Sequence, residues 1–333
     1  MKVFRLIFVS LTVACLSCSK APLAHESGEW AYLTFTPVFG HTVDVQTKAP
    51  FGTIDGVNFT FAGSIFVYNQ GTTTPHVLGY ENLKAQVDAQ WDPNLSEFGF
   101  TWQFFPNGVE TDGLDVIGIM KGTPVDVYAY VPYTSGMSDI STIPFVTSEQ
   151  NDIMLAREEN IVVESSMANK FLRFTHVQSC ITLRVKTVFS NSDYISNVYI
   201  RNVSEDIIAK SGNINAKTGA ISDLVYGREW MNVSIYPHLQ LSPGTATDFD
   251  IIIPPVDDYD NPSGIEMRLR ARYGFDTETF YLPLPPVQQD GTHPFKSGKR
   301  YIYEVTLDDF VMISPNVTVR DYDTVPTVSE LEF

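Results

Sequence analysis

His176 and Cys180 are the residues of this chain whose types could form a nucleophilic pair, because a thiol becomes reactive when a nearby base takes its proton. They lie four positions apart in a segment that alternates apolar and polar residues, as a strand does. In an extended strand that separation is about 13 Å, which is too long for proton transfer. We therefore expect Cys180 to be a buried structural thiol and His176 to be packed or hydrogen-bonded at the margin of a sheet.

The densest group of oxygen ligands is the run 257–261, which reads Asp-Asp-Tyr-Asp-Asn. Calcium prefers oxygen ligands, but Pro262 stands where a loop of alternating ligands would need its next one, and no glutamate closes the loop at EF-hand spacing. We expect a solvated acidic hairpin loop here and no metal. No cofactor is expected either, because the chain lacks a glycine-rich loop between a strand and a helix.

No other motif indicates catalysis. Glycoside hydrolysis needs two carboxylates at a defined separation, and the 39 acidic residues of the chain offer any number of pairs. Neither a Gly-x-Ser-x-Gly nucleophile elbow nor a His-Glu-x-x-His segment occurs. We therefore expect a protein that is not an enzyme.

Cys18 is the residue whose position in the sequence most clearly indicates export and attachment to a membrane. Residues 1–17 have the form of a signal peptide: Lys2 and Arg5 give a basic start, and an apolar stretch of about eleven residues follows. This stretch is shorter than the roughly twenty apolar residues that cross a bilayer. A cysteine directly after such a leader predicts cleavage and acylation of the thiol, as in a lipoprotein. A plain secretory leader and acylation of Cys15 are the alternatives.

Removal of the leader leaves Cys180 as the only thiol besides the lipid site, so no disulfide within the chain is possible. The loss of Lys2 and Arg5 changes the formal net charge from −17 to −19. Such a surface repels phosphate backbones and anionic headgroups. We expect no nucleic-acid partner, and membrane attachment only through lipid on Cys18.

The elements that position these residues are predicted to be strands. Alternation of period two runs through 125–131, 181–186, 265–273 and 301–307, and turn-forming residues separate such segments. Only 81–90 and 151–159 suggest a turn or two of helix. Short strands between turns predict an all-β protein made of antiparallel sandwiches.

A polar run at 157–160 precedes a new series of strands and predicts a domain boundary. The expected organisation is a signal peptide at 1–17, a tether at 18–27, an N-terminal sandwich at 28–160 and a C-terminal sandwich at 161–333. Each sandwich then has a common domain size.

Both ends of the mature chain are strand-like. Residues 30–36 form a strand that starts about a dozen residues after Cys18. Lys48, which Ala49 follows, is one of few basic residues in the first half of the chain and lies in a loop-like segment, so it is a candidate for proteolysis. At the C-terminal end, 317–320 and 329–333 also alternate. A terminal strand either completes its own sheet or pairs with the open edge of a neighbour.

An ordered series of segments resembles the fimbrillin-like (Mfa-like) lipoproteins of Gram-negative anaerobes. The similar segments are 18–20, the early strand region that ends at 47–49, 151–156, 172–177, 211–219 and 298–305. The resemblance extends over nearly the whole mature chain. It implies two transthyretin-like sandwiches in tandem and a subunit of a type V pilus that reaches the outer membrane as a lipoprotein.

The resemblance also implies an assembly mechanism. A trypsin-like surface protease would cut between Lys48 and Ala49 and remove the first strand, and the opened groove would accept a strand from the next pilus subunit. The strand removed would carry Trp30, Tyr32, Leu33 and Phe35, and the C-terminal donor strands would carry Val317, Val319, Leu331 and Phe333. The partners are then other pilus subunits, the protease and a surface ligand for adhesion.

A surface lipoprotein that binds glycans is the alternative function. Trp30, Trp91, Trp102 and Trp230, together with 16 tyrosines, could stack on sugars. Large aromatic residues also fill sandwich cores and cover sheet faces. Only their placement distinguishes these two uses.

Overall fold

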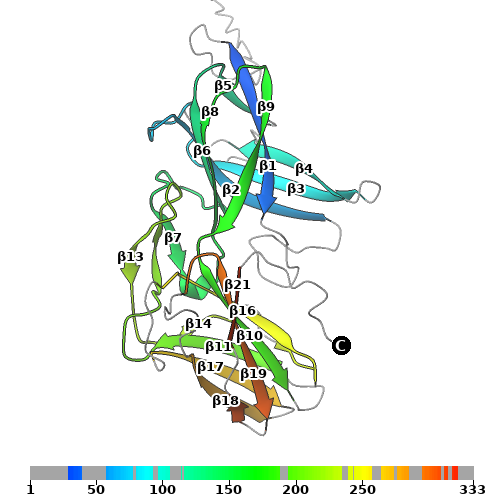
Figure 1. Cartoon of the computed structure of the whole chain (residues 1–333), viewed down its shortest axis with the longest axis vertical. Coiled ribbons are helices and arrows are strands. Elements are labelled where there is room, and N and C mark those ends of the chain that lie inside the picture. The colour runs from blue at the N-terminus through cyan, green and yellow to red at the C-terminus, as the bar shows by residue number, and fades with distance from the viewer. Residues whose placement is uncertain are drawn as a thin grey trace, which may run out of the picture.

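The computed structural model describes residues 29–39, 58–77, 80–92, 97–105, 114, 116–187, 194–234, 239–242, 244–256, 264–273, 276–284, 295–308, 311–313 and 317–321. Within these ranges the regular elements are strands and a single turn of 3-10 helix at Thr147–Glu149. Two β bodies follow one another along the long axis of the molecule, and a small sheet lies beside their junction (Figure 1). None of the described residues forms a helix long and apolar enough to cross a membrane. The prediction of an all-β protein is confirmed.

The N-terminal body is one eight-stranded sheet folded into two layers. Its strands are β1 (Trp30–Phe39), β2 (Asn58–Asn69), β3 (Leu83–Asp92), β4 (Glu97–Phe105), β5 (Ile117–Met120), β6 (Val125–Val131), β8 (Met154–Ile161) and β9 (Met167–His176), in the order β4-β3-β2-β6-β8-β9-β1-β5. Strands β8 and β9 pair only through Met154↔His176 and Leu155↔Thr175. One core cluster contains side chains from both sides of this short contact, so the two parts of the sheet pack face to face.

Strand β1 shows how alternation builds this core. Ala31, Leu33 and Phe35 are at most 2% exposed, whereas Tyr32 on the opposite face is 39% exposed. The Phe35 ring meets the ring of Phe104 in β4 edge to face, with centroids 6.3 Å apart. The first strand is therefore packed against the far layer of the body.

A three-stranded sheet covers the other face of β2 and β6. It contains β7 (Ile143–Val146), β12 (Ser211–Ile214) and β13 (Ile221–Val225), in the order β13-β12-β7. Its Ile143 and Phe145 join Tyr128 and Tyr130 of β6 in a second core cluster. All seven residues of β6 are consequently buried, although their alternation predicts a half-exposed strand.

The C-terminal body packs two five-stranded sheets around one core. The first sheet contains β16 (Thr247–Ile253), β10 (Ser179–Thr187), β19 (Lys299–Asp308), β20 (Val311–Ile313) and β21 (Val317–Asp321). The second contains β14 (Met231–Asn232), β11 (Tyr194–Asn202), β15 (Leu239–Gln240), β17 (Ile265–Tyr273) and β18 (Asp276–Pro283). Most pairs in both bodies are antiparallel, but β1 with β9 and β10 with β19 are parallel.

The strand pairing places the boundary between the bodies later in the sequence than we expected. We expected the change at residue 160, but β9 follows that point and hydrogen-bonds to β1 and β8. The chain therefore changes sheet after His176, and only Val177 and Gln178 separate β9 from β10. The expected helical turns at 81–90 and 151–159 are wrong, because β3 and β8 occupy most of these segments as paired strands.

Two buried side-chain amides join the bodies at this point. The Gln150 amide accepts a hydrogen bond from the Ile252 N–H (2.8 Å) and donates one to the Ile252 carbonyl (3.0 Å), as a neighbouring strand would. The Gln178 side chain accepts the N–H of Ile153 at 2.8 Å. Because these amides are buried and paired, they connect the sheets with backbone-like geometry.

Leu33 provides a test of the packing of β1. We expect Leu33→Ala to lower the free energy of unfolding by about 2–5 kcal/mol, because it leaves a cavity in a fully buried position. The measurement is urea unfolding followed by circular dichroism. Tyr32→Ala is the neighbouring control on the exposed face and is expected to cost much less. Equal losses in the two variants would show that β1 is not packed as described.

Candidate functional site

The strand that carries Trp30, Tyr32, Leu33 and Phe35 lies inside its sheet, not at an edge. On one side β1 pairs antiparallel with β5 over four residue pairs, from Trp30↔Met120 to Leu33↔Ile117. On the other side it pairs in parallel with β9 over eight pairs, from Tyr32↔Met167 to Phe39↔Phe174. Strand β1 is therefore paired with β5 along Trp30–Leu33 and with β9 along Tyr32–Phe39, so each of its sides carries a strand neighbour.

The side chains that flank β1 form an apolar groove, which the strand fills. Ile117 and Ile119 of β5 and Leu172 and Phe174 of β9 flank the strand, and all four are at most 3% exposed. They belong to the same core cluster as Leu33. Without β1, these side chains and the facing edges of β5 and β9 would meet water.

The start of β1 is held at the surface by Glu29 and Lys121. The Lys121 ammonium lies 2.6 Å from the Glu29 carboxylate, and the Lys121 N–H donates to the Glu29 carbonyl at 2.9 Å. The hydrogen bond from Lys121, and then its charge, lower the pKa of Glu29. Because this ion pair is exposed, it adds little to stability. The apolar groove is the main attachment of the strand.

His76 supports the outer neighbour of β1, and we did not identify it from sequence. Its Nε2 accepts the N–H of Met120 at 3.0 Å, and its Nδ1 lies 2.9 Å from the Asn69 side-chain oxygen, so the neutral ring donates there. Met120 is the residue of β5 that faces Trp30. Forty-four positions separate His76 from Met120, and no local pattern indicates their contact. Only the closed sheet brings them together.

We expect the stability of the protein to fall as the pH drops from about 7.5 towards 5. Burial lowers the pKa of His76 from its usual 6.5. The unfolded chain therefore binds this proton more readily, and the native state loses stability as pH falls through the range below 6.5. Protonation also removes the acceptor of the Met120 N–H.

The measurement is the urea midpoint at several pH values. His76→Gln, which does not titrate, is expected to be less stable at pH 7.5 but to depend less on pH. The same pH dependence in both proteins would contradict this role of His76.

The proposed donor residues Val317 and Val319 lie in β21, which completes the chain's own sheet. Val319 faces Tyr301 and Val317 faces Tyr303 in β19, and the Val319 side chain packs against the C-terminal core. Among the described strands β21 pairs with β19 alone, so it is an edge strand of five residues. The other proposed site residues, Cys18, Lys48, Ala49, Leu331 and Phe333, lie outside the described residues.

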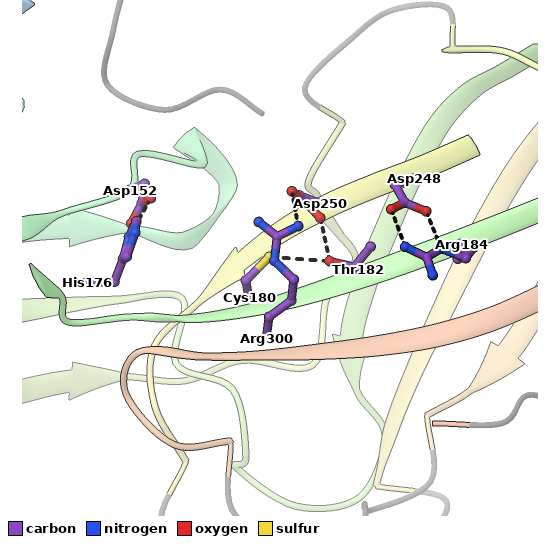
Figure 2. A network of polar contacts seen from close by, with 8 residues as sticks. All are labelled: Asp152, His176, Cys180, Thr182, Arg184, Asp248, Asp250 and Arg300. Carbon is purple, nitrogen blue, oxygen red and sulfur yellow. Dashed lines mark hydrogen bonds and ion pairs between the residues drawn. The ribbon is translucent and has the colours of Figure 1, made fainter. Parts of the chain in front are cut away.

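Cys180 is a buried structural thiol, as predicted. It is fully buried at the start of β10, and its Sγ lies 3.7 Å from the Thr182 hydroxyl, which donates to Asp250 (Figure 2). The Arg300 guanidinium lies 3.5 Å from the same carboxylate. Burial, and then the nearby Asp250 charge, raise the pKa of the Cys180 thiol. The reactive thiolate is therefore suppressed.

His176 belongs to a different polar group. Its Nδ1 lies 2.8 Å from a carboxylate oxygen of Asp152, at the end of β9 where the two bodies meet (Figure 2). This confirms the prediction of a hydrogen-bonded histidine at a sheet margin. The described residues contain no group of three His, Cys, Asp or Glu side chains that could hold a metal, and the acidic run 257–261 lies outside them.

Thiol labelling tests the burial of Cys180. In protein from which residues 1–18 have been removed, we expect Ellman's reagent to leave the native thiol unmodified and to titrate one thiol in urea. The physical reason is that the reagent needs an accessible thiolate. Rapid labelling without denaturant would contradict the described burial.

Comparison with known proteins identifies relatives of this fold. The model of the fimbrillin-like family matches residues 120–321, which is more than half of the chain. The match begins at Met120, the last residue of β5, and reaches Asp321 at the end of β21. Among curated proteins the comparison found no match.

Solved structures share the architecture at low sequence identity. A protein assigned to cell adhesion from Bacteroides uniformis has a TM-score of 0.55 and 16% identity over 88% of this chain and 98% of its own. Another from Bacteroides ovatus has a TM-score of 0.52 and 16% identity over 91% and 100%. A third, from Bacteroides fragilis, has a TM-score of 0.53 and 8% identity over 90% and 100%. These similarities show a common fold for nearly the whole chain.

Proposed function

The chain belongs to the fimbrillin-like family, and we propose that it is a non-enzymatic structural subunit of a cell-surface fimbria. In this proposal the precursor reaches the outer membrane as a lipoprotein acylated on Cys18. Proteolysis after Lys48 removes β1, and a strand of the next subunit replaces it. The observation that carries the proposal is the position of β1, paired on both sides and buried along one face.

Removal of an internal strand creates a binding site by itself. The backbone groups of β9 that pair with β1, and those of β5, would lose their partners, and unpaired backbone at an edge is a template for another chain. The apolar groove would also be exposed to water at a cost in free energy. An incoming strand that alternates apolar residues would restore both contacts.

The precursor is protected from premature assembly because β1 occupies this site. Among the described strands β5 pairs only with β1, so loss of β1 leaves β5 without a strand partner. A replacement strand must therefore bridge β5 and β9 together. The layer containing β2, β3, β4, β6 and β8 has its own pairing and does not need β1 to hold its strands.

The donor is proposed to come from the C-terminal end, where Val317 and Val319 alternate in β21 and Leu331 and Phe333 follow in the sequence. As a short edge strand with one neighbour, β21 has fewer contacts to break than an internal strand. Its release would supply alternating valines for the groove of another subunit. A role in adhesion at the cell surface follows from such a fimbria.

Limited proteolysis tests this mechanism. We expect trypsin to cut the purified precursor after Lys48 and to convert monomer to oligomer, because cleavage makes β1 removable. Mass spectrometry should find a new N-terminus at Ala49, and light scattering should measure the mass of the product. Lys48→Gln is the matched control: it should resist this cut and stay monomeric.

The oligomeric state of the protein after verified cleavage shows whether strand exchange is its mode of assembly. If the cut chain releases β1 and remains monomeric at high concentration, strand exchange is not its mode of assembly. If Lys48→Gln assembles as well as the wild type, cleavage at this residue is not the trigger.

A further inference from the structure

The outward face of the second C-terminal sheet is rich in arginine. Along β17, Ile265, Met267, Leu269 and Ala271 are buried in the core. The residues between them, which face outward, are Glu266, Arg268, Arg270 and Arg272. Three arginines thus follow one strand, at backbone positions about 7 Å apart, the spacing of alternate residues in a strand.

Aromatic rings hold the central arginine in place. In the register of the sheet Arg268 lies between Tyr199 of β11 and Tyr281 of β18. Its guanidinium carbon is 4.1 Å from the centroid of the Tyr199 ring and 4.7 Å from that of Trp230. The Trp230 ring also lies 6.1 Å from the ring of Tyr281, which is 54% exposed. Stacking of this kind fixes the guanidinium plane and leaves its N–H groups free to point outward.

Positive charge predominates on this face. Glu266 is paired with Arg201 at 2.6 Å, and Arg272 donates to the Tyr194 hydroxyl at 3.0 Å. Among the described residues, no carboxylate pairs with Arg268 or Arg270. This is unusual in a chain whose formal net charge is −17. Within the part of the chain that the structure describes, Arg268 and Arg270 therefore carry positive charge that no carboxylate neutralises.

We propose that this arginine–aromatic face, formed by Tyr199, Trp230, Arg268, Arg270, Arg272 and Tyr281, binds an anionic polysaccharide. A guanidinium fork matches the two oxygens of a carboxylate or the oxygens of a sulfate. Arginines at alternate positions of one strand suit a polymer whose charges repeat, and the exposed Tyr281 ring offers an apolar surface for a sugar ring. The net negative charge of the chain opposes any long polyanion, so the attraction must come from the local arginines on this face.

The site is independent of strand exchange. Strands β17 and β18 lie in the C-terminal body, at the opposite end of the molecule from β1 (Figure 1). The proposal adds a ligand class to the adhesive role, but binding is measured on the uncleaved precursor. A failure of polysaccharide binding and a failure of assembly are therefore distinguishable.

The test is titration of the uncleaved protein with polygalacturonate, dextran sulfate and neutral dextran. We expect saturable binding of at least one of the two anionic polymers, weakened by salt, and no binding of neutral dextran. Arg268→Ala should weaken binding about tenfold or more. Arg268→Lys should also weaken it, because it keeps the charge but loses the planar fork.

Arg173→Ala is the matched control, because it removes one exposed positive charge from β9 in the other body. Binding should remain unchanged in this variant. Trp230 gives a local readout: bound polymer should change tryptophan fluorescence in the wild type and not in Trp230→Phe. Thermal unfolding of each variant verifies that the outward substitutions leave the fold intact.

Several results would overturn the proposal. These are the absence of binding to both anionic polymers, equal binding of neutral dextran, and an equal loss of affinity in Arg173→Ala and Arg268→Ala. Self-association that Arg268→Ala abolishes, without polysaccharide binding by the wild type, would assign the face to a second copy of the chain instead.

Discussion

The pairing of β1 on both of its sides is the constraint on which the rest of the N-terminal body depends. Strand β1 supplies the only described strand partner of β5 and eight residue pairs to β9, and its Leu33 and Phe35 contribute to the core between the layers. The first strand of the chain is thus a component of the folded body that later strands are built around. The N-terminal body thus fills its own groove with β1. Loss of that strand would open the sheet between β5 and β9.

The two bodies of the molecule use the alternation of their strands differently. In the N-terminal body, β6 is buried on both faces because the small sheet covers its tyrosines. In the C-terminal body, β17 keeps one face outward and places its arginines there. The first arrangement gives stability and a fixed junction, and the second gives a surface that can meet other molecules. The two bodies thus differ in how much of their sheet faces is covered.

Much of the fold could be predicted from the sequence, and what could not depends on long-range pairing. Alternation correctly indicated the strands around Val125, Ile181 and Ile265, because burial of one face is a local pattern. The parallel pairs were not predictable, because they join segments that no hairpin turn connects. The boundary at residue 160 was displaced for the same reason: β9 returns to pair with β1. His76 was missed because its contact with Met120 exists only after the sheet has closed.

The short connection between β9 and β10 has a mechanical consequence. Strand β9 holds the strand in the β1 position, and after Val177 and Gln178 the same chain continues as β10, which lies between β16 and β19 in the other sheet. If a strand in that groove were pulled along its axis, the parallel ladder between it and β9 would be loaded in shear. All the hydrogen bonds of the ladder would then share the force. The load would then pass directly into the middle of the next sheet, past the amides of Gln150 and Gln178. The fold provides a continuous path for tension through both bodies.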